Sequence, residues 1–100
     1  METYLMFGKM TTEGTKFIKE WPESIKRAIA LNEEMGGKPI AFYSCSSMYD
    51  FIAIGEAPNA EVAEAFRRLI EADGLVRVQM IRVFTLEEFE GLIEAIEIEA

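Results

Sequence analysis

The stretch PIAFYSCSSMYDFIAIGEA, residues 39–57, decides the fold class. It contains two strand-like apolar runs, Pro39 to Ser46 and Tyr49 to Ala57, which are joined by Ser46-Ser47-Met48. A connection this short requires a hairpin between the two strands. The centre of the chain therefore predicts an antiparallel pair of strands with no helix between them.

The residues before this hairpin predict a strand followed by two helical segments. Thr3 to Met10 is bulky and apolar at successive positions, which is typical of a strand that is buried on both faces. Thr11-Thr12-Glu13-Gly14 breaks the strand and opens a helical stretch, and Pro22 suits the first turn of a second helix. We expect Gly36-Gly37 to end that helix, because glycine accepts a positive φ.

The residues after the hairpin predict a helix, a fourth strand and a last helix. Asn59 is placed to cap a helix that Asp73-Gly74 ends, and Leu75 to Phe84 follows as a strand. Thr85-Leu86-Glu87-Glu88 has the T-x-x-E form of a capping box. The whole order is typical of an α+β, ferredoxin-like βαββαβ domain with an antiparallel sheet and an added C-terminal helix. We expect one domain over residues 1–100, since a chain of this length holds a single core.

The first strand indicates that both faces of the sheet need cover. Tyr4 and Met6 project to one face. Leu5 and Phe7 project to the other, and none of these side chains suits water. Because the two crossover helices cover one face only, we expect a second copy to cover the other in a symmetric pair that encloses side chains or a ligand. The alternative is that the C-terminal helix folds back over that face.

The charge balance argues against nucleic acid and anionic membranes as partners. The chain has 18 acidic and 10 basic residues, and its net charge of -8 repels phosphate groups. Six acidic residues fall near the C-terminus: Glu87, Glu88, Glu90, Glu94, Glu97 and Glu99. Their spacing is typical of a solvated helix face and lacks the loop geometry of a calcium site.

The absence of histidine and the single cysteine exclude several classes of catalytic and metal site. The chain has no histidine, which excludes a Ser-His-Asp or Cys-His relay, a histidine-ligated haem and the common zinc sites. Its single cysteine, Cys45, allows no internal disulfide, and without a neighbouring base we expect it to be a small buried apolar side chain. We expect no metal, no cofactor and no membrane span, and a cytoplasmic protein.

Several short segments share the pattern of a known family: Tyr4-Leu5-Met6-Phe7-Gly8-Lys9, Thr11 to Gly14, Gly36-Gly37, Phe42-Tyr43, Tyr49-Asp50 and Met80 to Thr85. Together they resemble the GYD-domain family of small bacterial and archaeal proteins over nearly the whole chain. Met48 stands where that family has the glycine of its Gly-Tyr-Asp triplet. The resemblance implies a ferredoxin-like, dimeric α/β-barrel architecture, and it brings no activity with it.

Asp50 and Arg82 are the candidate catalytic residues. Asp50 places a carboxylate at the head of an apolar strand, where burial beside Tyr43 or Tyr49 would make it a general base. The alternative is that it stabilises the hairpin turn through backbone N–H groups. Arg82 lies among apolar neighbours and needs an anion, which could be Asp50, a glutamate of a partner subunit or an acidic ligand. A structural ion pair is the alternative for Arg82.

The predicted ligand-binding set is wider: Tyr4, Lys9, Tyr43, Tyr49, Asp50 and Arg82. The phenol groups suit an aromatic or quinone-like molecule, and Trp21 could form a wall beside it. Core packing is the alternative for the aromatic residues, and simple solvation is the alternative for Lys9.

Three functions follow from these features. The first is a homo-oligomeric protein that binds a small molecule in a pocket at the sheet face. The second is a cofactor-independent monooxygenase or isomerase, as found among relatives of this architecture, with Asp50 as base and Arg82 or a tyrosine as its electrostatic partner. The third is a structural or interaction domain without a pocket, whose acidic last helix meets a basic partner.

Overall fold

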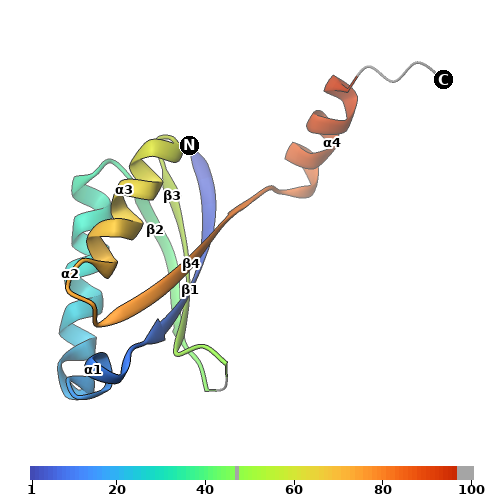
Figure 1. Cartoon of the computed structure of the whole chain (residues 1–100). Coiled ribbons are helices and arrows are strands. Elements are labelled where there is room, and N and C mark those ends of the chain that lie inside the picture. Colours follow the sequence, from blue (N-terminus) through green and yellow to red (C-terminus); the bar gives the residue numbers. More distant parts are fainter. Residues whose placement is uncertain (47, 97–100) are drawn as a thin grey trace.

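The computed structural model describes residues 1–46 and 48–96 and shows the predicted order of elements (Figure 1). The elements are β1 (Glu2–Met10), α1 (Thr12–Thr15), the 3-10 helix η1 (Ile18–Glu20), α2 (Trp21–Glu34), β2 (Lys38–Ser44), β3 (Phe51–Ala57), α3 (Ala60–Glu71), β4 (Val76–Val83) and α4 (Leu86–Ala95). Ser47, in the predicted hairpin turn, and Glu97 and Glu99, in the predicted acidic terminus, lie outside the described residues.

The four strands form one antiparallel sheet in the order β2-β3-β1-β4. β1 is central, so that Tyr4 lies opposite Gly55 of β3 on one side and Arg82 of β4 on the other. This order is that of two strand–helix–strand units, β1–α2–β2 and β3–α3–β4, which are joined by the hairpin between β2 and β3. The predicted ferredoxin-like α+β fold with an added helix is confirmed.

The helix ends lie where local sequence signals place them. The side chain of Asn59 caps α3, and Gly36 follows α2 with a φ of 86°. Pro22 occupies the first turn of α2, where its missing N–H costs no hydrogen bond. Thr85 and Glu88 form the capping box of α4. These predictions are confirmed because each depends on neighbours a few positions away.

The hairpin differs from its prediction in the length of its turn. β2 and β3 are antiparallel, but residues 45–50 connect them instead of Ser46-Ser47-Met48. Asp50 directly precedes β3 and still bonds to both neighbouring segments: its N–H donates to the carbonyl of Gly8 at 2.8 Å and its carbonyl accepts from the N–H of Cys45 at 2.9 Å. Because β3 begins at Phe51, Tyr49 and Asp50 belong to the connection and not to the strand as predicted.

The core lies between the sheet and the helices α2 and α3. Its buried apolar side chains are Tyr4, Phe51, Ala57, Ala63, Phe66, Val76 and Val78. Gly8 makes room for one of them, since a Cβ at Gly8 would lie 2.0 Å from the ring of Phe51. The core of one copy is thus restricted to one face of the sheet.

The last helix does not return to the sheet. Figure 1 shows α4 beyond the end of β4, on the side of the sheet away from α2 and α3, and residues 84–96 are all exposed. The alternative in which the C-terminal helix folds back over the second sheet face is therefore not the arrangement of this structure.

Candidate functional site

The second face of the sheet is a broad apolar surface, which we call the open face. Strand alternation and register place the following residues on it, opposite the buried core: Leu5, Phe7, Ala41, Ile52, Ile54, Ile81 and Val83. Ile81 is 41% exposed although it lies in the middle of β4. The described helices leave this apolar surface uncovered in the single chain.

Tyr49 extends the open face beyond the strands. Its ring lies 4.9 Å from that of Phe7, measured between centroids, and its hydroxyl donates to Oε1 of Gln79 at 3.0 Å. Tyr43 lies on the same face through its pairing with Ile52, and it is 64% exposed. The open face therefore combines aromatic surface with hydrogen-bonding groups at the end of the sheet near the hairpin connection.

Asp50 uses its carboxylate within the fold. Its Oδ2 accepts a hydrogen bond from the backbone N–H of Met10 at 2.7 Å, so the hairpin connection is attached to the end of β1. This bond joins the adjoining ends of two neighbouring strands, β1 and β3, and its partners are 40 positions apart in the chain, which is why the sequence alone did not indicate it. The contact is structural in kind, as in the turn-stabilising alternative for Asp50.

Arg82 and Tyr4 lie on the helix side of the sheet and share one carboxylate. Oε1 of Glu2 accepts from the Tyr4 hydroxyl at 2.7 Å and lies 3.7 Å from Nε of Arg82. Burial is the main cause that raises the pKa of Tyr4, and the hydrogen bond to Glu2 adds to it. The carboxylate nearest to Arg82 is therefore that of Glu2 in the same chain, and the predicted pairing of Arg82 with Asp50 is not formed.

The predicted ligand-binding set is divided between the two faces. Tyr43, Tyr49 and Lys9 belong to the open-face side, whereas Tyr4 and Arg82 belong to the helix side. Asp50 and Arg82 also lie at opposite ends of β1, since the first contacts Gly8 and Met10 and the second is paired with Tyr4. No space within one copy brings all six residues together, because strand register separates them.

Lys9 and Arg77 form a pair of cations on the open face. They are direct neighbours in the register of β1 and β4, and both are exposed. Among residues 1–46 and 48–96, neither has a carboxylate within ion-pair distance. Like charges at opposed strand positions repel, so this end of the open face favours an anionic neighbour.

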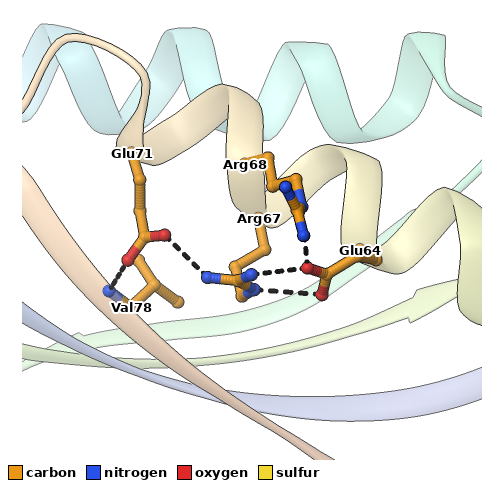
Figure 2. Close-up of polar contacts among 5 residues, drawn as sticks. All are labelled: Glu64, Arg67, Arg68, Glu71 and Val78. Carbon is orange, nitrogen blue, oxygen red and sulfur yellow. Dashed lines mark hydrogen bonds and ion pairs between the residues drawn. The ribbon is translucent and has the colours of Figure 1, made fainter.

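An ionic cluster on α3 serves the fold instead (Figure 2). Arg67 bonds Glu64 through Nε at 3.0 Å and Glu71 through Nη1 at 2.6 Å, and Glu71 in turn accepts from the backbone N–H of Val78 at 2.7 Å. The hydrogen bond from Arg67, with a second from Arg68, lowers the pKa of Glu64 to about 2. The cluster joins α3 to β4 and blocks one N–H of that edge strand.

A separate cleft of about 230 Å³ lies on the helix side, between α2 and the strands β2 and β3. Its walls are almost wholly apolar, and none of the six predicted ligand residues lines it. Trp21, the predicted wall, also lies on this side of the sheet, packed against the core, and donates from Nε1 to the carbonyl of Gly14 at 3.0 Å. Sequence reasoning did not indicate this cleft, because packing between distant elements creates it.

Comparison with known proteins adds one result to this geometry. The model of the GYD domain matches residues 4–93, which is nearly the whole chain. A search of curated proteins found no significant match. None of the described helices combines the length and apolar character that crossing a membrane requires.

Proposed function

This chain belongs to the GYD-domain family, and on that premise we propose that it is a homodimer that binds a small molecule between two sheets packed face to face. The observation that supports this most is the open face, which has apolar residues from all four strands and is covered by neither the crossover helices nor α4. Burying apolar surface gains about 25 cal/mol per Å², so two such faces attract each other.

A second copy is the simplest cover for this surface. A two-fold contact is the commonest oligomeric interface, because one patch serves both partners. Two sheets packed in this way lie about 10 Å apart, with the side chains of both inner faces between them. Where those side chains are short, such as Ala41, space is left for a ligand.

The residues around this space favour a planar aromatic or quinone-like ligand. Phe7 and Tyr49 supply ring surface at 4.9 Å, and Gln79 with the Tyr49 hydroxyl supplies hydrogen bonds. A binding role is favoured over the enzymatic alternative, because the carboxylate of Asp50 bonds to Met10 and Arg82 lies on the other side of the sheet. The two candidate catalytic groups do not converge on one space in a single copy.

The dimer is tested by sedimentation of the purified protein and of Ile81→Glu. We expect a wild-type dimer at micromolar concentration and a monomeric variant, because a glutamate buried among the apolar side chains of the open face would lose its hydration. Leu69→Glu is the matched control, since Leu69 is a comparably exposed apolar residue on the helix side. A monomeric wild-type protein would overturn the proposal.

Ligand binding is tested by native mass spectrometry, for any small molecule released on denaturation, and by calorimetry with menadione as an aromatic quinone probe. We expect the dimer to bind the probe and Tyr49→Leu to bind it at least about tenfold more weakly. Tyr4→Phe, altered on the helix side, should bind like the wild type. A dimer with no released molecule and no affinity for the probe would refute the ligand site and favour a structural domain.

A further inference from the structure

The helix α4 has an apolar stripe that no described part of the chain covers. The side chains of this stripe are between 46 and 73% exposed: Leu86, Phe89, Leu92 and Ile93. A helix of ten residues is marginal in water by itself, because nucleation costs more than so few hydrogen bonds return. The stability of α4 therefore calls for a contact outside the body of its own chain.

Contacts at the start of α4 set its direction. β4 continues into Phe84, and the guanidinium of Arg82 lies over its ring, 4.2 Å from the centroid. Oγ1 of Thr85 then accepts from the N–H of Glu88 at 3.0 Å, while Oε1 of Glu88 accepts from the N–H of Thr85 at 2.9 Å. These contacts hold α4 as a continuation of β4 and away from the open face of its own sheet.

A second copy seated on the open face would lie on the same side of the sheet as α4. This helix lies on the side of the sheet opposite α2 and α3, which is the side of the open face (Figure 1). A copy seated on the open face would therefore have α4 of the first copy next to it. Because a two-fold axis makes every contact reciprocal, one arrangement covers the open face and the stripe of α4 in both copies.

Charge indicates which part of the second copy α4 meets. A groove of about 440 Å³ runs along the apolar stripe and is bordered by Glu90 and Glu94. Lys9 and Arg77 are cations of the open face that have no ion pair among the described residues, and they are paired across β1 and β4. Lys9 and Arg77 lie at one end of the β1–β4 pair. α4 begins at the other end, where Thr3 is paired with Val83.

We propose that α4 is an arm that clasps the second copy, packing its apolar stripe against that copy and setting Glu90 and Glu94 beside the other copy's Lys9 and Arg77. The inference rests on the proposed dimer and adds the relative direction of its two sheets. The strands of one sheet run antiparallel to those of the other, because only then does α4 of one copy lie near the Lys9–Arg77 end of the other copy's sheet. It also explains how a chain with a net charge of -8 associates with itself, because the acidic arm meets the basic end.

A charge exchange tests the arm. We expect Glu90→Lys with Glu94→Lys, and separately Lys9→Glu with Arg77→Glu, each to raise the dimer dissociation constant at least about tenfold at low salt. Combining all four substitutions should restore the wild-type value to within a few-fold. Glu33→Lys with Glu34→Lys, an equal charge change at exposed positions of α2, is the control and should not weaken the dimer.

The outcomes separate this inference from the proposed function. A wild-type monomer would overturn both. A wild-type dimer that Ile81→Glu dissociates, but that neither charge reversal weakens, would overturn the arm alone. The arm alone would also be overturned if each charge reversal weakens the dimer and the combination of all four substitutions does not restore the wild-type dissociation constant. A second measurement uses Lys9→Cys with Glu94→Cys in a Cys45→Ser background, where oxidation should produce a covalent dimer and each single substitution should not.

Discussion

The carboxylate of Asp50 accepts a hydrogen bond from the backbone N–H of Met10 at 2.7 Å, although the two residues are 40 positions apart in the chain. With the bond from the N–H of Asp50 to the carbonyl of Gly8, it attaches the hairpin connection to β1. The same connection places Tyr49 against Phe7 on the open face. Asp50 thus positions an aromatic residue of the candidate site through its bonds to β1.

Asp50→Ala should therefore lower stability. The N–H of Met10 would lose an ionised acceptor, and a hydrogen bond of this kind contributes about 1.5–3 kcal/mol. Urea unfolding at one fixed protein concentration measures the change, with Asp50→Asn as the control that keeps an acceptor oxygen and loses less. Unchanged stability together with lost menadione binding would instead indicate a direct role in the site.

The Glu64–Arg67 pair predicts a dependence on pH. The pKa of Glu64 is lowered to about 2 from an ordinary value of 4.5, so its contribution to stability is complete above pH 4.5 and is lost as the pH falls toward 2. We expect the stability difference between the wild type and Glu64→Gln to shrink over this interval. The effect should be small and salt-sensitive, because the carboxylate is exposed.

Chemical unfolding between pH 2 and 6, at low and high salt, checks this expectation. Glu61→Gln is the control on the same helix, since Glu61 is exposed and belongs to no described ion pair. A difference between wild type and Glu64→Gln that stays constant down to pH 2 would contradict the lowered pKa.

Replacing glycine by alanine should have opposite effects on stability at Gly8 and at Gly91. Gly8→Ala should destabilise the protein by about 1–3 kcal/mol, because its Cβ would overlap the ring of Phe51. Gly91→Ala should stabilise α4 by about 0.5–1 kcal/mol, since Gly91 is inside that helix and has open space around it. Thermal unfolding measures the first effect and amide hydrogen exchange of α4 the second. Equal effects at both positions would be inconsistent with this packing.

The capping box of α4 predicts that the arm can be loosened locally. Thr85→Ala removes the acceptor of the Glu88 N–H and should cost α4 about 0.5–2 kcal/mol, whereas Thr85→Ser keeps that acceptor. Hydrogen exchange should speed up in α4 and stay unchanged in the core strands. If the arm clasps a second copy, the dimer dissociation constant should rise in Thr85→Ala and not in Thr85→Ser.

Much of the fold could be predicted from the sequence because its signals act over short distances. The strand of β1, the cap at Asn59, the glycine end at Gly36 and the capping box at Thr85 each depend on residues within one turn or one strand. The order of these elements, together with the central hairpin, predicts the ferredoxin-like fold, and the short motifs carry the resemblance to the GYD-domain family. Both are confirmed.

The candidate site was less predictable, because it depends on which residues strand pairing brings together. By itself, the sequence determined the order of the elements, the caps of the helices and the apolar character of both faces of β1. Only the tertiary structure decided that Arg82 meets Glu2, that Asp50 meets Met10, and that Lys9 lies beside Arg77. The physical reason is that register is a long-range property: a shift of one residue moves every side chain of a strand to the other face, and no local pattern encodes the choice.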